Sequence, residues 1–526
     1  MAEKDRYILA IDLGTSGPKV ALITTHGEVV AHAFEENTVN YLPGGGAEQD
    51  PEQWWQTIKI AAKRALAEAA VPAARVIGVN CTTQWSGTVA VDAAGAPLAD
   101  AIIWMDTRGA RHIDSVAGGL VKIEGYGALK LMNWIRKTSG IPTRSGKDPI
   151  AHILFLKNER PEIYRAADKF LEPKDFINLR LTGKVASSAD AIALHWVANI
   201  RDVNDVRYDD QLLRQMGVER GKLPDLRPVN SVLGPLLPAV AEELGLLPET
   251  PVVMGTPDVQ SAAVGSGAVR DFEGHIYVGT SSWLTCHVPF KKTDIFHNMA
   301  SLPAAIPGRY FIANEQETAG ACLTFLRDNV LYHKDELLQE AALPDVYKIF
   351  DQIAARVPAG SDGVIFTPWL YGERSPVDDH TVRAALFNLS MRTTREQIIR
   401  AFFEGVAFNT RWLLGYVERF IGRRFDHLNF IGGGANSEVW CQIFADVCDR
   451  PIRQVKDPIH CNARGVAFLA AAALGEISYD QIGERTAVNQ TFTPQAANRS
   501  IYDELFAAFV HIYKSNKALY AKLNAH

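Results

Sequence analysis

The chain has 526 residues, of which 47% are hydrophobic and 22% charged, and its formal net charge is −6. This length exceeds what one hydrophobic core serves, so we expect two domains of roughly 250 residues each. The slightly acidic balance includes no basic block, which argues against nucleic acid as a main partner. Charged first residues and the lack of an apolar run of about 18 residues predict neither a signal peptide nor a membrane span.

Six cysteines are scattered along the chain, and none forms a Cys-x-x-Cys pair. A chain of this size has no need of disulfide bonds, so we expect free thiols and a cytoplasmic location. Cys441 and Cys448 lie seven residues apart on an expected helix. That spacing is typical of core residues rather than of a metal or redox site.

Short apolar strands alternate with helical stretches, which predicts the α/β fold class. The opening is typical of a meander of strands at 7–11, 18–23 and 29–34. A helix should follow from Pro51 to about residue 70, because Asp50 is a suitable N-cap and proline favours the first helical position.

Strands at 76–80 and 88–91 flank a polar segment, and the region from about 111 to 246 is helical and rich in loops. We interpret this region as an insertion that shapes a substrate pocket. A strand at 251–254 opens the second half, where a strand–turn–strand unit recurs at 275–286. No low-complexity linker separates the halves, so we expect a packed hinge.

A long helix is expected at 395–420, because Thr394 and Gln397 have the spacing of a capping box. A strand at 428–431 and a helix at about 437–448 follow, with a glycine-rich turn between them.

The tripeptide Gly-Thr-Ser occurs twice, at Gly14–Ser16 and Gly279–Ser281, and each copy follows an apolar strand. Such turns expose backbone N–H groups and hydroxyls that can hold an anion, because glycine permits close approach. Two copies half a chain apart predict a duplicated fold that holds a polyphosphate, ATP, between its halves. Ordinary core hairpins are the alternative.

Charged residues accompany the first turn. Lys19 supplies a cation for phosphate oxygens, and Asp12 supplies a carboxylate for a magnesium ion or its water shell. The segment Gly432–Asn436 lies between an expected strand and helix, where the helix N-terminus favours an anion, although such turns are also common without a ligand. Neither a Rossmann nor a Walker pattern is present.

Two further segments have the chemistry of a sugar kinase. Asp258, on an expected turn, can accept a proton from an alcohol that attacks phosphorus, although aspartate is also common in turns for local reasons. Gln84–Ser86, with Trp104–Arg108, places polar groups beside indoles and suits a sugar, with a structural tryptophan as the alternative. Gly372–Ser375 is either a solvated loop or a salt bridge that closes the domains.

Taken together, these segments resemble the FGGY carbohydrate kinases of the actin/hexokinase/heat-shock ATPase superfamily, and most closely the xylulokinase branch. The resemblance covers nearly the whole chain. It implies two actin-like (ribonuclease H-like) α/β domains with a nucleotide cleft between them: 1–254 on the sugar side, including the insertion at about 111–246, and 255–526 on the nucleotide side. It is carried by Asp12–Lys19, Glu48–Pro51, Trp104–Arg108, Leu171–Asp175, the Asp258 turn, Tyr277–Ser281, Pro368–Arg374, Arg400–Gly405 and Ile431–Asn436.

Carried over by position, the resemblance makes Asp258 the catalytic base and, with Asp12, a magnesium ligand. The ATP-binding residues that it implies are Gly14, Thr15, Ser16, Lys19, Gly279, Thr280, Gly320, Gly433, Gly434 and Asn436. The substrate-binding residues that it implies are Gln84, Trp85, Ser86, Asp106, Asp258 and Val259.

The chain departs from the xylulokinase pattern at positions that would read the sugar. Xylulokinases typically have Met-His at Trp85-Ser86 and Asp-Asn at Asp258-Val259, so hydrogen-bonding groups that discriminate between polyols are lost. His152 also replaces a usual lysine and Asn388 a usual glycine. The ATP machinery is kept, and D-xylulose as the substrate is put in doubt.

We therefore expect an ATP- and Mg²⁺-dependent kinase that phosphorylates a small sugar, such as the ketopentose xylulose. Alternatives with the same chemistry are ribulose or another ketose, a polyol such as glycerol or erythritol, and a sugar acid such as gluconate. An ATP-driven conformational protein or a sugar sensor without kinase activity is less favoured. A homodimer is compatible with the resemblance.

Overall fold

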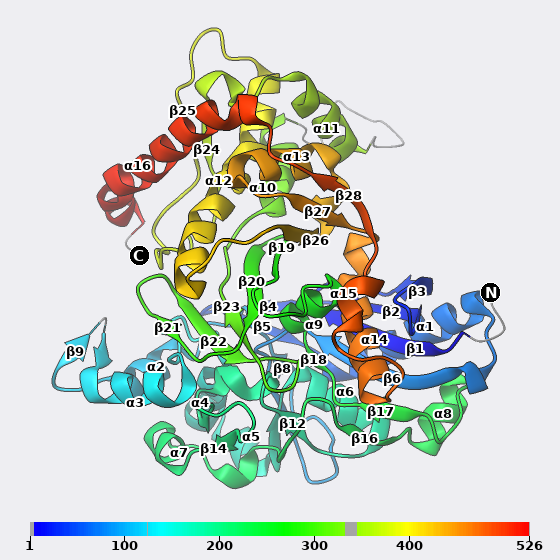
Figure 1. Cartoon of the computed structure of the whole chain (residues 1–526). Helices are drawn as coiled ribbons and strands as arrows, with labels where there is room; N and C mark the ends of the chain where they lie inside the picture. Colours follow the sequence, from blue (N-terminus) through cyan, green and yellow to red (C-terminus); the bar gives the residue numbers. More distant parts are fainter. Residues whose placement is uncertain (1–4, 124, 332–344, 525–526) are drawn as a thin grey trace, which may run out of the picture.

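The computed structural model describes residues 5–123, 125–331 and 345–524. Figure 1 shows a lower part, mostly blue to green, and an upper part, mostly yellow to red. Each part is built around a mixed β-sheet that is covered by helices. The predicted α/β class with two domains is confirmed.

The first sheet combines an antiparallel meander with parallel crossover strands. Its order is β16 (Val232–Pro235), β17 (Pro251–Val253), β6 (Val76–Thr83), β1 (Tyr7–Gly14), β2 (Gly17–Thr24) and β3 (Val29–Phe34), with β18 (Thr256–Pro257) also paired to β6. The meander of β1, β2 and β3 is antiparallel, and β6 lies parallel to β1. The strands expected in this half are confirmed.

Strand β1 is buried on both faces, which explains its continuous apolar sequence. Its odd-numbered residues 7–13 pack in the core that includes α1 (Pro51–Ala69), whereas Ile8 and Ala10 pack against α14 (Cys461–Ala473). Helix α1 starts as predicted, because the Asp50 side chain accepts a hydrogen bond from the N–H of Glu52 at 2.8 Å.

The region 111–246 is helical and rich in loops, as predicted. Its helices are α2 (Ala110–Ala117), α3 (Ala128–Thr138), α4 (Pro149–Glu159), α5 (Pro161–Ala166), α6 (Pro173–Thr182), α7 (Asp210–Met216) and α8 (Pro238–Leu244). The core of this region also contains Leu302 and Phe311, which come from the second sheet. The two halves therefore share a hydrophobic contact, which agrees with the packed hinge that we expected.

The second sheet repeats the mixed pattern. Its order is β21 (Thr293–Asp294), β22 (Met299–Pro303), β23 (Tyr310–Ala313), β20 (Ser282–Val288), β19 (Gly274–Val278), β26 (Leu428–Ile431), β27 (Ile452–Val455) and β28 (Val488–Phe492). β19 and β20 form the expected antiparallel pair, and β26 lies parallel to β19. The helices α12 (Arg395–Ile421) and α13 (Glu438–Cys448) pack in its core. The capping box of Thr394 and Gln397 is present.

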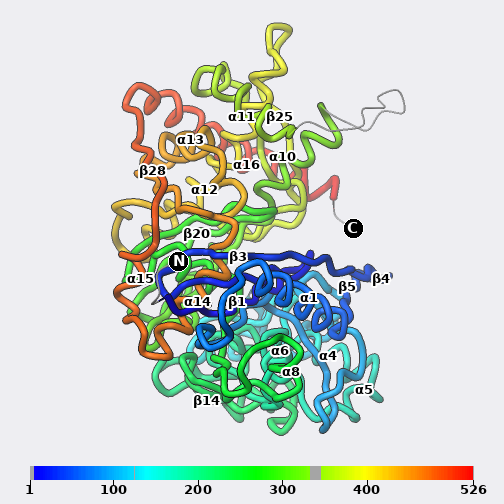
Figure 2. The backbone as a smooth tube through the Cα atoms, turned by 90° about the vertical axis from the view of Figure 1, so that its right-hand side faces the viewer, coloured from blue at the N-terminus to red at the C-terminus, as the bar shows by residue number. Residues whose placement is uncertain are grey.

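Helix α14 crosses back to the first sheet, although its sequence follows the second. Figure 1 shows it in orange beside the blue strands β1 and β6, and Figure 2 shows the same arrangement from the side. It lies against α9 (Asp258–Gly265) so closely that a Cβ at Gly465 would collide with the Ser261 carbonyl. The second half of the chain thus contributes to both parts of the molecule, and the boundary after residue 254 stays a prediction.

Shorter elements surround these sheets. They include β4 (Asn40–Leu42), β5 (Gly46–Gln49), β7 (Val89–Val91), β8 (Ala101–Ile102), β9 (Lys122–Ile123), β10 (Tyr126–Gly127), β11 (Lys169–Leu171), β12 (Ser187–Ser188), β13 (Ala198–Asn199), β14 (Arg207–Tyr208), β15 (Leu226–Arg227), β24 (Ile365–Thr367), β25 (Ala385–Phe387), α10 (Gly320–Phe325), α11 (Val346–Arg356) and α15 (Gln481–Arg485). Within the described ranges, no helix has both the length and the apolar character needed to cross a membrane. All six cysteines are buried and free, and Cys441 and Cys448 lie in the core, as expected.

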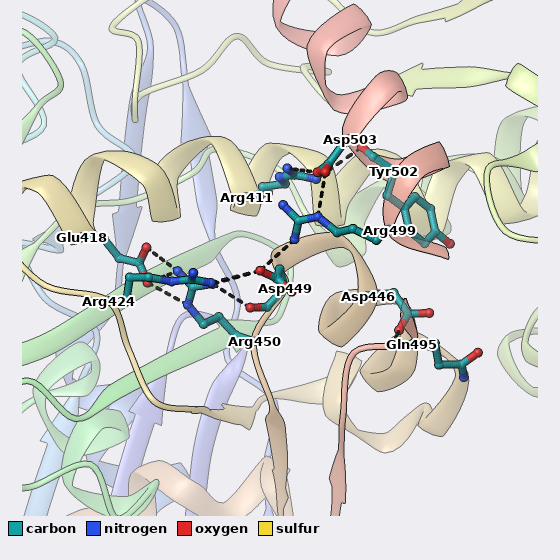
Figure 3. A network of polar contacts seen from close by, with 10 residues as sticks. All are labelled: Arg411, Glu418, Arg424, Asp446, Asp449, Arg450, Gln495, Arg499, Tyr502 and Asp503. Atoms are coloured by element: carbon teal, nitrogen blue, oxygen red, sulfur yellow. Dashed lines mark hydrogen bonds and ion pairs between the residues drawn. The ribbon is translucent and has the colours of Figure 1, made fainter. Parts of the chain in front are cut away.

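The last helix, α16 (Arg499–Leu523), is tied to the second part by a network of ion pairs (Figure 3). Arg499 lies 2.7 Å from Asp503 and 2.8 Å from Asp449, and the guanidinium of Arg411 also binds Asp503. Glu418, on α12, pairs with Arg450. These contacts join α12, the end of α13 and the start of α16.

Candidate active site

Both Gly-Thr-Ser turns lie at the tips of antiparallel strand pairs. The first connects β1 to β2, with Gly14 opposite Gly17, and the second connects β19 to β20. Ser16 and Thr280 are exposed, so their hydroxyls are accessible to a ligand. The hairpin geometry that we predicted for the two turns is confirmed, whereas their role as phosphate cradles stays a prediction.

Gly320, at the start of α10, lies directly beside the second turn. Its N–H donates to the carbonyl of Gly279 at 2.8 Å, and the N–H of Ala319 donates to the carbonyl of Thr280 at the same distance. A Cβ at Gly320 would collide with the Gly279 carbonyl, so this close approach requires glycine.

A cavity of about 1040 Å³ opens beside the second turn, between α10, α11 and the 3₁₀ turn at Gly433–Asn436. The predicted ATP-binding residues that line it are Gly279, Thr280, Gly320, Gly433, Gly434 and Asn436. The other predicted ATP contacts, Gly14, Thr15, Ser16 and Lys19, are not in its lining. Sequence reasoning missed further lining residues, among them Tyr347, Asp351, Tyr371 and Trp440, because no local motif marks them.

The hydroxyl of Thr15 is already occupied by protein partners. It accepts a hydrogen bond from Nε1 of Trp104 at 3.0 Å and donates one to Oε1 of Gln84 at 3.1 Å. Nε2 of Gln84 donates to Oε1 of Gln49 at 2.8 Å, and Nε2 of Gln49 donates to the Thr15 carbonyl at 2.8 Å. This ring of side chains fixes the first turn, so the turn offers a ligand its backbone N–H groups and the hydroxyl of Ser16. Gln49 lies in the segment Glu48–Pro51 that carries the resemblance, but this ring was not anticipated.

Asp12 and Lys19 face each other across the β1–β2 pair. Nζ of Lys19 lies 3.7 Å from Oδ2 of Asp12, whose side chain is almost fully buried. Burial raises the pKa of Asp12, and hydrogen bonding with Asn462 and the charge of Lys19 offset only part of that effect. The site therefore holds a carboxylate that gains from any additional cation.

Asp258 is the first residue of α9 and not a turn residue as we expected. The correction has a local cause, since the small residues after it form a helix and Pro257 provides an extended N-cap. Oδ1 of Asp258 accepts a hydrogen bond from the N–H of Val259 at 2.8 Å. Burial, followed by the charge of Asp12, raises the pKa of Asp258 to about 7. This carboxyl can therefore exchange a proton near neutral pH.

The carboxylates of Asp12 and Asp258 fit a magnesium ion that is completed by other ligands. Carboxylate oxygens are hard donors. The charge of Asp12 raises the pKa of Asp258, an effect that a divalent cation would relieve. The described residues contain no group of three or more His, Cys, Asp or Glu side chains able to hold a metal ion alone. The two carboxylates of Asp12 and Asp258 suit a Mg²⁺ ion that is bound largely through phosphate oxygens and water.

The segment from Trp85 to Ser86 is firmly positioned. Nε1 of Trp85 donates to the Ala191 carbonyl at 2.8 Å, and Oγ of Ser86 donates to the Lys147 carbonyl at 2.7 Å. Val259 packs around the same hydrophobic core as Trp85. The indole edge is thus tied to the helical insertion.

Two of the predicted sugar contacts have side chains that are engaged elsewhere. The carboxylate of Asp106 accepts hydrogen bonds from the N–H of Ala47 and from Nε of Arg108, both at 2.9 Å. The amide of Gln84 is held in the ring around Thr15. Their roles in sugar binding stay predictions, and the contacts that we observe are structural.

The charged segment 372–375 is held by salt bridges and is not a solvated loop, and the partners of Arg374 lie in the same half of the chain. Arg374 pairs with both Glu315 and Glu317. Nζ of Lys147, in the insertion, lies 3.6 Å from Oε1 of Glu317. Lys147 and Arg374 also lie over the ring of Trp104, at 6.0 and 5.8 Å from its centroid. The network therefore connects the second half to the tryptophan that holds Thr15.

Two family models match the chain in sequence order. The N-terminal domain of the FGGY family of carbohydrate kinases matches residues 7–265, and the C-terminal domain of the same family matches residues 274–474. The chain belongs to the FGGY family of carbohydrate kinases. The expected resemblance is confirmed, and the turns, the cavity and Asp258 lie within the matched ranges of this FGGY kinase.

Similar proteins include sugar kinases with different substrates. A xylulose kinase of Staphylococcus epidermidis is 27% identical over 98% of each chain, and a gluconokinase of Bacillus subtilis is 26% identical over 98% of this chain and 97% of its own. The crystal structure of a gluconate kinase from Lactobacillus acidophilus superposes with a TM-score of 0.85 at 24% identity, covering 99% of this chain and all of its own. The fold of an FGGY kinase is therefore shown.

The two other departures from the xylulokinase pattern have structural explanations. His152 is buried, and its Nδ1 lies 3.2 Å from Oγ1 of Thr88. Asn388 has a φ of 64°, in the left-handed region that asparagine tolerates better than most residues. Neither change touches the cavity.

Proposed function

We propose that this FGGY kinase transfers the γ-phosphoryl group of ATP to a hydroxyl of a small neutral sugar, with Asp258 as the general base. The observation that carries the proposal is a carboxyl with a pKa of about 7 beside Asp12, in a fold whose second phosphate turn borders a cavity large enough for a nucleotide.

In this mechanism the ionised Asp258 takes the proton of the sugar hydroxyl as its oxygen attacks the γ-phosphorus. The bond to the β-phosphate oxygen breaks, and ADP leaves. Backbone N–H groups of the two turns and Lys19 would stabilise charge on the transferring group. Magnesium, held through Asp12 and Asp258 and the phosphates, would neutralise part of that charge. Closure of the two halves excludes water and so limits hydrolysis of ATP.

The charges around the site favour a neutral sugar over a sugar acid. Asp12 and Asp258 are carboxylates of the site, and Glu315 also raises the pKa of Asp258. The nearby cations are already paired: Lys19 with Asp12, and Lys147 and Arg374 with Glu315 and Glu317. A substrate carboxylate would therefore meet net negative surroundings. A ketopentose such as xylulose is our first candidate, and the similarity to a gluconokinase makes gluconate the second.

The test is ADP formation from Mg·ATP across ketopentoses, ketohexoses, polyols and sugar acids. We expect one neutral sugar to give the strongest response, and Asp258→Asn to lower turnover at least about 10²-fold while nucleotide still binds. Preference for gluconate would overturn the choice of a neutral sugar. Rapid hydrolysis without any sugar would instead favour an ATP-driven conformational protein.

The proposed role of Trp85 in sugar binding can be tested separately. Trp85→Ala should raise the KM for the sugar and leave the KM for ATP near its original value, because the indole borders the insertion and not the cavity. Trp85→Phe is the matched control, since it removes the bond to Ala191 but keeps an aromatic face. Equal KM values for the sugar in all three proteins would move the sugar site elsewhere.

A further inference from the structure

Tyr277 lies next to the second phosphate turn, on β19. Its ring stacks on Trp283 at a centroid distance of 3.9 Å and an angle of 6°. Nε1 of Trp283 donates to Nε2 of His275 at 3.1 Å, which fixes the indole and hence the stacked phenol. The position of the Tyr277 ring is therefore determined by the sheet and not by a mobile loop.

The phenol covers the backbone of the turn. A Cβ at Gly279 would collide with the hydroxyl and the ring edge of Tyr277, so the oxygen lies against the first residue of the Gly-Thr-Ser turn. The side chain is partly exposed, and no residue in the described ranges forms a hydrogen bond with its hydroxyl. A donor with no protein partner thus faces the place where we propose that phosphate binds.

The same hydroxyl interacts electrostatically with the two carboxylates of the site. Burial, and then the charges of Asp258 and Asp12, raise the pKa of Tyr277 above its ordinary value. The phenol consequently stays protonated and remains a hydrogen-bond donor throughout the neutral pH range. The charges of the proposed base and of the proposed magnesium ligand act on this hydroxyl, which also lies against the second turn.

We infer that Tyr277 is a further catalytic residue, whose hydroxyl donates a hydrogen bond to the phosphoryl group during its transfer. The inference rests on the proposed function. A neutral donor suits this position, because a lysine or arginine there would lower the pKa of Asp258 and weaken it as a base. The phenol supplies a hydrogen-bond donor without adding a charge. It does so where the phosphoryl group passes from the leaving oxygen of ADP to the attacking oxygen of the sugar.

The experiment is steady-state kinetics of Tyr277→Phe, which keeps the stacked ring and removes only the hydroxyl. We expect kcat to fall at least about 10-fold, with the KM for the sugar, the affinity for ADP and the thermal midpoint near their original values. The ratio of the rate with ATP to the rate with its γ-thio analogue should also be smaller in the variant. Sulfur accepts hydrogen bonds poorly, so the replacement of oxygen by sulfur matters less once the Tyr277 donor is gone. Tyr513→Phe, which removes from α16 a hydroxyl that donates to Asp379, is the matched control and should keep the original kcat.

Each result has a distinct meaning. An unchanged kcat in Tyr277→Phe overturns the inference, and so does a loss of kcat with an unchanged thio ratio or a matching loss of thermal stability. If the original protein forms no ADP with any sugar, the proposed function fails and the role of Tyr277 fails with it. A kinase that works and is indifferent to Tyr277→Phe leaves the function standing.

Discussion

The carboxylate of Asp12, in β1, is the largest influence after burial on the pKa of Asp258, at the first residue of α9. The two residues are 246 positions apart in sequence, and the first sheet brings them together because β18 and β1 both pair with β6. Burial and the repulsion by Asp12 keep the proposed base partly protonated near neutral pH. A bound cation would release that proton, so metal binding and activation of the base are coupled.

The pH dependence of catalysis should reflect this carboxyl. Because the pKa of Asp258 is about 7 before a cation binds, kcat/KM for Mg·ATP should rise with pH through about 7 and fall about tenfold per unit well below it. The pKa of Glu373 is also about 7, owing to burial, but its carboxylate accepts hydrogen bonds from Asn409 and from backbone N–H groups. Glu373→Gln should therefore keep the acidic limb of the profile. If the acidic limb disappears in Glu373→Gln, the carboxyl that titrates is Glu373 and not Asp258.

Asp258 should also cost the protein stability at high pH. Its pKa is about 7 in the folded state against an ordinary 3.8, so the folded state binds this proton more tightly. Its contribution is most favourable at low pH and is lost as pH rises from about 4 through 7, with an upper bound of about 4 kcal/mol. Asp258→Asn should raise the thermal midpoint more at pH 8 than at pH 5. An equal gain at both values would contradict the raised pKa.

The ion pairs around Arg374 should matter more than surface ion pairs. Its side chain is 19% exposed and pairs with two glutamates, and its charge, with that of Lys147, outweighs burial to hold the pKa of Glu317 below its ordinary range. Arg374→Met would leave Glu315 and Glu317 without their main partner, at a cost of about 3–5 kcal/mol. We expect a large drop in the thermal midpoint that shrinks at pH 5, where glutamates take up protons. Lys147→Met, which loses a 3.6 Å contact with Glu317 and a distant contact with the ring of Trp104, is the control and should cost less.

Local sequence patterns predicted the elements of the fold well. The N-cap at Asp50, the capping box at Thr394 and the hairpins around both Gly-Thr-Ser turns depend on neighbouring residues, and all are present. Patterns of this kind carry their own physical cause, so they can be recognised without tertiary information.

Contacts between distant residues could not be predicted in the same way. The hydrogen bond from Trp104 to Thr15 spans 89 positions, and the pairing of Arg374 with Glu317 spans 57. Helix α14 was not expected to return to the first sheet, because its Ala-rich sequence fits any close helix crossing. The motifs predicted the type of site, whereas the contacts between its residues depend on the fold.

The last prediction concerns the network of ion pairs between α12, the end of α13 and α16 that Figure 3 shows. Arg450 is 7% exposed and Glu418 14%, whereas Arg499 and Asp503 are 40% and 43% exposed. Glu418→Gln leaves a nearly buried guanidinium short of its main partner. Asp503→Asn instead weakens the pairs with Arg499 and Arg411, which solvent screens at the half-exposed carboxylate. We expect Glu418→Gln to lower the free energy of unfolding by about 3 kcal/mol or more, and Asp503→Asn by about 1 kcal/mol or less. Urea unfolding of the two variants, which both keep the side-chain shape, checks this. Equal losses would mean that the whole network acts as one unit and that burial does not rank its members.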